Sequence, residues 1–402
     1  MEKMKVDGYD AVIIGGGLSG LMASIWLTTK GRHVAVVSKG DPMCCLSTGC
    51  IDVLGHTDSP LKDIRKLPSS HPYRMIGQDT IKEALAFFKE VMEGIGLHYT
   101  GDPSRNAEIL TPVGTPKTTC LVPSTMRIMS NLEDEYLHVV SFKGLKDFYP
   151  SYIISRNKNA NFSIFDMGVY NTMGLAHAFE EKAFLGRFIR RIRELEISDA
   201  RIAVPAVLGL RSPERIMEEI RLETEKDIFE IPTLPPSIPG LRLFRGLKQA
   251  LLEKGGQIYW GKEIASVEKT GNKVEAITLA GEGKPTRVHG KTFLLSTGSF
   301  ISGGLYATRE SKAYETVFDL PVYMPDKRHK WFNDDFFKTG HPIERAGILV
   351  RESFRPKDND IDNLFVSGSI LAFSEIMKYQ CGHGLAISTG VAAAKQMDGF
   401  LK

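Results

Sequence analysis

The fold of this chain is decided at residues 9–21, which read Tyr9-Asp10-Ala11-Val12-Ile13-Ile14-Gly15-Gly16-Gly17-Leu18-Ser19-Gly20-Leu21. An apolar run of strand type passes into a Gly15-x-Gly17-x-x-Gly20 turn and then into a helical pattern, and a second β-branched run follows at 34–37. Strand, tight turn, helix and strand within about 30 residues form the context in which this glycine spacing predicts a dinucleotide-binding site. The helix N-terminus would offer free N–H groups to the phosphates.

The composition is that of an ordinary soluble globular protein. The chain has 402 residues, of which 42% are hydrophobic and 25% charged, with a net charge of +3. This length predicts two or three domains, and the near-neutral charge argues against a nucleic-acid partner. Five cysteines, an odd number in a long chain, favour reduced thiols and a cytoplasmic setting.

The apolar run at residues 9–27 is nearly long enough to cross a bilayer. The triple glycine divides it, Asp10 lies inside it, and no small-residue cleavage pattern follows. We therefore expect a buried strand and helix, no transmembrane segment of the chain's own, and membrane contact only through a partner.

Two later apolar strands also end in glycine. Residues 292–296 lead into Thr297-Gly298-Ser299, and residues 363–367 lead into Gly368-Ser369. The stretch Gly382-His383-Gly384 then opens a terminal helix at 385–400. Ligands of open α/β sheets bind at the carboxyl ends of strands, so these glycines are expected at the same edge as Gly15.

The middle of the chain alternates strands with helices, which predicts a separate parallel α/β unit. The strand-like runs lie at 137–142, 162–165, 202–207 and 228–231, and the helical patterns at 145–154, 174–195 and 213–222. A proline-rich connector at 232–240 is expected to be rigid and extended.

The glycine-bearing strand ends, in this order, resemble flavoproteins of the glutathione-reductase-like class, in the variant shared by succinate dehydrogenase and fumarate reductase. Within that group the chain is most similar to the family formed by the B subunits of anaerobic glycerol-3-phosphate dehydrogenases. The matching segments are His71-Pro72-Tyr73, Thr111-Pro112-Val113-Gly114-Thr115, Pro232-Thr233-Leu234-Pro235-Pro236-Ser237, Gly298-Ser299-Phe300-Ile301-Ser302-Gly303-Gly304-Leu305, Asp335-Phe336-Phe337, and Asn363-Leu364-Phe365 with Gly368-Ser369.

The resemblance implies an α/β chain with a Rossmann-like FAD/NAD(P)-binding flavoprotein fold and an inserted α/β domain. The expected division is a flavin-binding domain in three segments (1–60, 236–310 and 346–402), an inserted substrate or partner domain at 61–235 with its parallel α/β unit near 137–231, and a short cap at 311–345.

The resemblance also implies a role in oxidising sn-glycerol 3-phosphate to dihydroxyacetone phosphate, with quinone as the final electron acceptor. Two partners are implied, a catalytic A subunit that contains FAD and an iron–sulfur subunit that anchors the complex at the inner face of the cell membrane. The flavin of this chain is left open between FAD and FMN.

The glycine turns and the resemblance together predict the residues that hold the flavin. They are Gly15, Gly17, Leu18, Ser19, Gly20, Ser38, Lys39, Ser47, Thr48, Gly49, Thr297, Gly298, Gly368, Ser369, Gly382, His383 and Gly384. Ser38-Lys39 stands where most enzymes of this fold place an acidic residue, yet the pair resembles the succinate dehydrogenase group. The alternative is a turn with a solvated lysine.

Leu46 occupies the position at which the succinate dehydrogenase group has a histidine that bonds covalently to flavin. Since leucine cannot form that bond, the flavin should be noncovalent. Gln380 stands where fumarate reductases have an arginine, which counts against fumarate reduction.

The sequence does not reveal a catalytic base. Arg355 and His383 are the candidate catalytic residues, with a supporting or solvated histidine as the alternative for His383. The basic clusters at 187–193 and 327–330 could contact a phosphate, although most such runs are solvated helix faces. The cysteines have neither iron–sulfur nor zinc spacing, so we expect no metal and structural thiols.

Two rival functions remain open from the sequence. One is a stand-alone flavin-dependent reductase or dehydrogenase of another small acid or enoate. The other is a non-catalytic interaction subunit that has lost its flavin.

Overall fold

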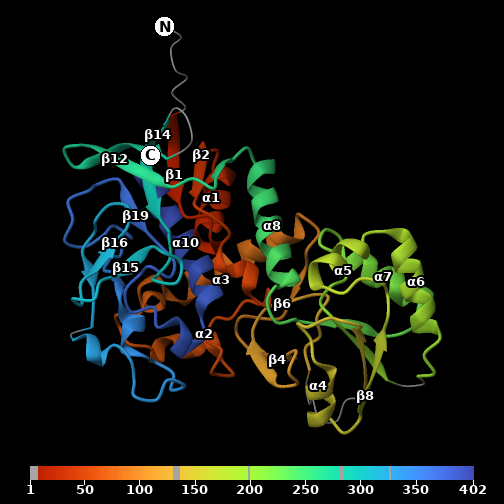
Figure 1. Cartoon of the computed structure of the whole chain (residues 1–402). Helices are drawn as coiled ribbons and strands as arrows, with labels where there is room; N and C mark the ends of the chain where they lie inside the picture. The colour runs from red at the N-terminus through yellow and green to blue at the C-terminus, as the bar shows by residue number, and fades with distance from the viewer. Residues whose placement is uncertain (1–7, 130–135, 198–199, 281–284, 326) are drawn as a thin grey trace. The chain divides into compact units, whose positions relative to one another are not determined.

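The computed structural model describes residues 8–129, 136–197, 200–280, 285–325 and 327–402 (Figure 1). The chain divides into two compact units. The first unit comprises the chain up to Met43, Pro60–Val91 and Leu247–Lys402, and the second unit comprises Cys44–Ser59 and Met92–Gly246. Residues 1–7 of the first expected segment lie outside the described residues.

The first unit is built on a mixed sheet in the order β11-β2-β1-β14-β13-β12, with β19 also paired to β14. Its strands are β1 (Gly8–Ile14), β2 (Val34–Ser38), β11 (Gln257–Trp260), β12 (Ile264–Thr270), β13 (Lys273–Leu279), β14 (Thr286–Leu295) and β19 (Leu364–Val366). The strands β11, β2, β1, β14 and β19 run parallel. Strand β13 is antiparallel both to β14 and to β12.

Strand β14 pairs with two strands on the side opposite β1, because its two halves have different partners. Residues 286–289 pair with β13, whereas Phe293–Leu295 pair with β19. The second half, Phe293, Leu294 and Leu295, is fully buried, as expected for a strand of a covered parallel sheet. The β13 pairing therefore ends before the carboxyl end of β14, and β19 brings its own carboxyl end to that edge.

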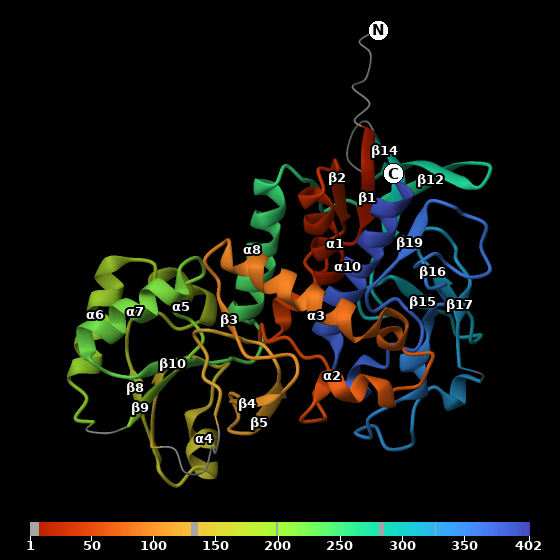
Figure 2. The ribbon, with the colours of Figure 1, turned by 180° about the vertical axis from the view of Figure 1, so that it is seen from behind.

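Helices α1 (Leu18–Thr29) and α10 (Gly382–Phe400) lie alongside each other in both views (Figures 1 and 2). Small residues permit this approach, since a Cβ at Gly390 would lie 2.4 Å from the carbonyl oxygen of Ser19. Arg32, which follows α1, pairs with Asp398 near the end of α10 at 2.7 Å. The two helices therefore run in the same direction, away from the carboxyl edge of the sheet.

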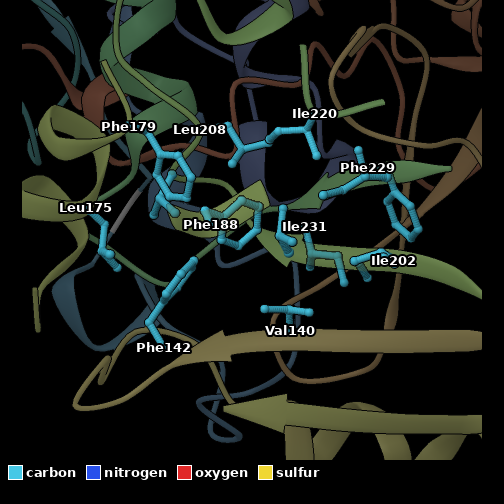
Figure 3. Close-up of a cluster of buried hydrophobic side chains, with 14 of the residues drawn as sticks. Val140, Phe142, Leu175, Phe179, Phe188, Ile202, Leu208, Ile220, Phe229 and Ile231 are labelled. Atoms are coloured by element: carbon cyan, nitrogen blue, oxygen red, sulfur yellow. The ribbon is translucent and has the colours of Figure 1, made fainter. Parts of the chain in front are cut away.

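The second unit contains a four-stranded sheet in the order β10-β9-β7-β8. Its strands are β7 (Leu137–Phe142), β8 (Ala160–Phe165), β9 (Arg201–Pro205) and β10 (Ile228–Ile231), and all three pairings are parallel. This sheet occupies the region in which the alternating pattern predicts a parallel α/β unit. In the core of this unit, aromatic side chains such as Phe142, Phe179 and Phe188 pack together with aliphatic ones (Figure 3).

The helices of this unit are α4 (Pro150–Arg156), α5 (Thr172–Ala178), α6 (Lys182–Arg193) and α7 (Pro213–Thr224). The single helix expected at 174–195 was wrong, because the structure has two helices there. The break has a physical cause at Glu180, whose carboxylate accepts the backbone N–H groups of Leu210 and Arg211. Buried Phe179 packs against Phe184 and Phe188 at the same point.

The remaining elements connect these sheets or follow them. In chain order they are η1 (Met43–Leu46), α2 (Pro60–Asp63), η2 (Ile64–Lys66), α3 (Pro72–Glu93), β3 (Tyr99–Thr100), β4 (Ala107–Leu110), β5 (Pro116–Thr119), β6 (Val122–Pro123), α8 (Ile238–Glu253), β15 (Leu305–Ala307), β16 (Ala313–Glu315), β17 (Val322–Tyr323), η4 (Arg328–Lys330), η5 (Pro342–Arg345), β18 (Gly347–Ile348) and α9 (Ile376–Tyr379). Among the helices of the described residues, none is long and apolar enough to cross a membrane.

The two compact units divide the chain differently from the expected domains at four stretches. Residues 44–59, expected in the first flavin-binding segment, cluster with the second unit. Residues 61–91 cluster with the first unit, because Glu83 of α3 pairs with Lys395 of α10 and His71 bonds to the carbonyl of Ser374. Residues 236–246 cluster with the second unit, because buried Arg242 pairs with Glu230. The stretch 311–345 forms no separate unit and clusters with the first.

Candidate flavin site

Three glycine turns lie side by side at the carboxyl edge of the first unit's sheet. The N–H of Gly15 donates to the Val37 carbonyl at 2.8 Å, and the N–H of Ser296 donates to the Ile14 carbonyl at 2.8 Å. The N–H of Ser367 donates to the Leu295 carbonyl at 3.0 Å. The structure therefore brings together the ends of β2, β1, β14 and β19, which is the placement that ligands of open α/β sheets require.

The first glycine turn is tightly packed at Gly20 and open at Gly17. A Cβ at Gly20 would lie 2.0 Å from the Gly15 carbonyl oxygen, so only glycine fits there. Gly15 itself has a φ of 118°, which other residues rarely adopt. A Cβ at Gly17 would meet no described atom within 4 Å. Gly17 is the N-cap of α1 and offers no side-chain cap, so the first N–H groups of the helix face an open approach suited to a pyrophosphate.

The turn after β19 is fixed by side chains of both helices. The hydroxyls of Ser19 and Ser367 are 2.8 Å apart, and the N–H of Gly368 donates to the Thr389 hydroxyl at 3.0 Å. Gly368 has a φ of 85°. These contacts connect the start of α1, the end of β19 and α10 into one framework.

The turn after β14 carries a buried hydroxyl, Oγ1 of Thr297, that has no hydrogen-bond partner among the described residues. The neighbouring Gly298 has a φ of 80°, and a Cβ there would lie 3.4 Å from Oγ of Ser369. Thr297, Gly298 and Ser369 therefore gather at one point of the edge. An unsatisfied buried hydroxyl is costly unless a ligand completes it, so this residue fits a bound flavin.

Replacing Thr297 with valine is expected to raise the free energy of unfolding of the FAD-free protein by about 1 kcal/mol, because it removes a buried hydroxyl that has no partner among the described residues. The change keeps the shape and removes only the hydroxyl described above. The FAD dissociation constant should rise about three- to tenfold, the range for one hydrogen bond. Thermal unfolding and fluorescence titration with FAD would measure the two quantities. An unchanged dissociation constant would exclude a contact between this hydroxyl and the flavin.

Ser38 and Lys39 lie at the end of β2 with different surroundings. Ser38 is buried, and its hydroxyl donates to the Gly40 carbonyl at 3.0 Å. A Cβ at Gly16 would lie 2.7 Å from the Ser38 hydroxyl, so this side chain faces the first glycine turn. Lys39 is exposed and pairs with Glu263 at 2.7 Å.

The N-terminus of α10 extends beyond the same edge. Gly390 packs on Ser19 at the start of α1, and α10 begins at Gly382, about 12 Å earlier at 1.5 Å per residue. A Cβ at Gly382 would meet nothing within 4 Å in the described part of the chain, and His383 is half-buried in the first helical turn. The positive end of the helix macrodipole is thus available to an anionic group at this edge.

Ser47, Thr48 and Gly49 belong to the second unit, where surrounding segments hold them. The Ser237 hydroxyl donates to the Ser47 carbonyl, and the Tyr99 hydroxyl donates to the Gly49 carbonyl at 2.8 Å. A Cβ at Gly240 would lie 2.3 Å from the Cys44 carbonyl oxygen, so α8 begins in close contact with this segment. Leu46 is exposed beside them.

Arg355 does not lie at the flavin edge. Its guanidinium carbon is 5.1 Å from the ring centroid of Phe400, at the far end of α10, and 5.8 Å from that of Phe365. A cation at the C-terminal end of a helix complements the macrodipole. This position suits a structural role, and a catalytic role of Arg355 stays a prediction.

Replacing Arg355 with methionine should destabilise the protein by about 1 kcal/mol, the scale of a cation–π contact and a helix-end charge. The affinity for FAD and the rate of substrate oxidation should stay unchanged. Thermal unfolding and enzyme assays of the same preparation test this. A fall in rate at unchanged stability would restore the catalytic interpretation.

The structure also shows where the cysteines and the basic cluster of α6 lie. All five cysteines are buried thiols, and burial raises the pKa values of Cys50 and Cys120 to about 12. Within the described residues no cluster of three or more metal-ligating side chains occurs. The arginines of α6 lie on its exposed face, where Arg191 and Arg193 pair with Glu194 and Glu223.

Sequence reasoning missed two serines that build the edge. Ser367 contacts Ser19, and the Ser296 hydroxyl donates to the Ile14 carbonyl at 3.1 Å. Both follow directly after buried parallel strands, a position that could have drawn attention to them.

The comparison with known protein families supports a flavin site at this edge of the sheet. The sequence model of the FAD binding domain family matches residues 10–385. The chain is therefore an FAD-binding flavoprotein. This assignment confirms the expected fold class and supports FAD among the two flavins that the sequence left open.

The curated relatives define the family more narrowly. The chain is 30% identical to the B subunit of the anaerobic glycerol-3-phosphate dehydrogenase of Aliivibrio fischeri, over 97% of this chain and 95% of that protein. It is 29% identical to a protein of Halobacterium salinarum named as the probable B subunit of the same enzyme, over 96% of each. The chain belongs to the family of anaerobic glycerol-3-phosphate dehydrogenase B subunits, which confirms the resemblance.

Solved structures that align with the chain are more distant. A 3-ketosteroid Δ1-dehydrogenase from Sterolibacterium denitrificans aligns with a TM-score of 0.47 and 12% identity, covering 98% of this chain and 100% of that one. An E. coli quinol fumarate reductase aligns with a TM-score of 0.46 and 9% identity, covering 99% and 71%.

Proposed function

We propose that this chain is the B subunit of a flavin-dependent complex that oxidises sn-glycerol 3-phosphate to dihydroxyacetone phosphate and passes the electrons to quinone. The observation that carries the proposal is the 30% identity to such a B subunit over 97% of this chain. The flavin edge of the first unit supports it independently, because its open glycine turn, buried hydroxyl and helix N-termini suit a bound dinucleotide.

FAD is proposed to lie along this edge. The turn from Gly15 to Gly20 would receive the pyrophosphate, and the neighbouring Ser38 and Lys39 would border the adenosine ribose. Thr297, Gly298, Gly368 and Ser369 would contact the ribityl chain or the flavin ring, and Gly382, His383 and Gly384 would lie beside the ring at the N-terminus of α10. A flavin contact of Ser47, Thr48 and Gly49 stays a prediction from the sequence.

FAD, when bound, supplies two-electron acceptance from a carbon–hydrogen bond. The chain contributes binding, orientation and charge stabilisation. Of the candidate site residues, Lys39 is engaged in an exposed ion pair with Glu263. Among the candidate flavin-binding residues, His383 is then the one titratable side chain left that could transfer a proton. The site is therefore poor in groups for acid–base catalysis.

This scarcity supports a division of labour within the complex. We propose that an A subunit containing FAD performs most of the substrate chemistry and that this chain relays electrons or completes the assembly. An iron–sulfur subunit would carry the electrons onward and hold the complex at the inner face of the cell membrane. The relatives are named as subunits of an enzyme, which supports the existence of partners.

Co-purification of the chain with and without the products of neighbouring genes tests the function. Acid precipitation should release the flavin, because Leu46 cannot form a covalent link, and chromatography should identify it as FAD. Glycerol 3-phosphate should bleach the flavin absorbance of the complex and not that of the isolated chain. Bleaching of the isolated chain would favour a stand-alone dehydrogenase, and a colourless chain within the complex would favour a non-catalytic role.

A further inference from the structure

The loop that leads into α10 is conformationally strained. Three of its non-glycine residues have left-handed backbone angles, Phe373 at φ 61°, Glu375 at φ 38° and Gln380 at φ 47°. Such angles are unfavourable for residues with a Cβ and persist only where the surroundings hold them. Since the loop ends at Cys381, the N-cap of α10, its conformation decides where the positive end of that helix lies.

A buried histidine from a distant part of the chain holds the inner side of this loop. Nε2 of His71 lies 3.2 Å from the Ser374 carbonyl oxygen, and the Tyr73 N–H donates to Nδ1 at 3.1 Å. Because Nδ1 accepts, the proton of the neutral ring resides on Nε2 and donates to Ser374. His71 is 1% exposed, and its ring meets that of Tyr379 edge-on at 5.3 Å.

The same carbonyl connects His71 to the helix. The Ser374 oxygen also accepts from Sγ of Cys381, at 3.8 Å. The outer side of the loop has separate anchors, since buried Glu375 pairs with Lys378 at 2.9 Å and with Arg345 at 3.3 Å. Glu344 also accepts the N–H groups of Met377 and Lys378, at 3.1 Å each. The loop is thus held at several points, and His71 contacts the carbonyl that also accepts from the N-cap residue Cys381.

We propose that His71 is a positioning residue for the flavin. Through the carbonyl of Ser374 it fixes the loop 373–381 and so aims the N-terminus of α10 at the carboxyl edge of the sheet. A helix N-terminus stabilises negative charge, so this placement favours the reduced, anionic flavin over the oxidised one. The proposal rests on the FAD site proposed above.

The surroundings of His71 keep its ring neutral at neutral pH. Burial lowers the pKa of His71 to about 4, with Lys378 acting in the same direction, while the Ser374 carbonyl and Glu375 act against the shift. At neutral pH the ring therefore keeps one acceptor and one donor nitrogen, as both backbone contacts need.

The test compares three variants of the full chain reconstituted with FAD. His71→Phe removes both hydrogen bonds. His71→Gln places an amide N–H where Nε2 lies, whereas His71→Asn is one methylene shorter and cannot reach the Ser374 carbonyl. The FAD dissociation constant and the midpoint potential of the bound flavin are measured for each variant. His138→Gln is the matched control, because His138 is another buried histidine but lies in the second unit, bonded to Ser163.

We expect His71→Phe and His71→Asn to weaken FAD binding at least tenfold and to lower the midpoint potential. His71→Gln should keep the FAD affinity and the midpoint potential close to those of the wild type. His138→Gln should change neither quantity. If His71→Phe does not fold, the Gln and Asn variants still decide the question. An unchanged potential in the Asn variant, or a Gln variant as impaired as Asn, would overturn the proposal. Failure of the wild-type chain to bind FAD would instead overturn the proposed function on which it rests.

Discussion

Replacing Gly17 with alanine is expected to raise the FAD dissociation constant at least about tenfold, a loss of about 1.4 kcal/mol of binding free energy. The new Cβ would meet no described protein atom within 4 Å, so the FAD-free protein should fold normally. The same Cβ would project into the approach to the first turn of α1, where the pyrophosphate is proposed to lie. Valine at this position should weaken binding further. Fluorescence titration with FAD measures the constants.

Gly399→Ala provides the matched control for Gly17→Ala. A Cβ at Gly399 would likewise meet no described atom within 4 Å, but this residue lies at the far end of α10. Its FAD affinity should equal that of the wild type. Equal affinities for the Gly17 and Gly399 variants would contradict the placement of the pyrophosphate. Gly20→Ala is unsuitable for this purpose, because its Cβ would lie 2.0 Å from the Gly15 carbonyl oxygen and disturb the turn itself.

Replacing Arg242 with methionine is expected to destabilise the second unit by about 3–5 kcal/mol. The Arg242 guanidinium donates to both carboxylate oxygens of Glu230, at 2.6 and 2.9 Å, and to the Gly209 carbonyl at 2.8 Å. The Glu230 side chain is 0% exposed, so the variant would leave a buried carboxylate without its cation. Chemical denaturation followed by circular dichroism would report the loss.

A double-mutant cycle separates the ion pair from its surroundings. Glu230→Met alone should also be strongly destabilising, because it leaves the guanidinium buried and removes the acceptor of the Leu208 N–H. The double variant, Arg242→Met with Glu230→Met, should lose less stability than the sum of the single variants, since neither charge is then left unpaired. Strict additivity would show that the pair contributes little.

The first glycine turn was predictable because its requirements are local. The close approach of Gly20 to Gly15 and the open side of Gly17 depend on residues within one strand–turn–helix unit, and glycine spacing encodes them directly. The parallel sheet formed by β7 to β10 was also predictable from a local sequence pattern. Buried strands of a parallel sheet are apolar throughout, and helices must separate them in the sequence.

The expectations that failed depended on contacts between distant segments. A helical pattern at 174–195 could not reveal that Glu180 accepts N–H groups from Leu210 and Arg211 and interrupts the helix. The surroundings of Arg355 were likewise beyond the sequence. Its guanidinium lies beside β19, 5.8 Å from the ring centroid of Phe365, but the folded chain also places it against Phe400 at the far end of α10.

The sequence by itself determined the nucleotide-binding turn, the order of the glycine-bearing strand ends and the family, because short-range spacing and whole-length similarity need no coordinates. The turns after β1, β14 and β19 lie at one edge, as the sequence predicts. Only the tertiary structure left Oγ1 of Thr297 buried without a partner among the described residues and brought His71 beneath the loop that leads into α10. These are contacts between residues up to hundreds of positions apart, and packing rather than local sequence selects them.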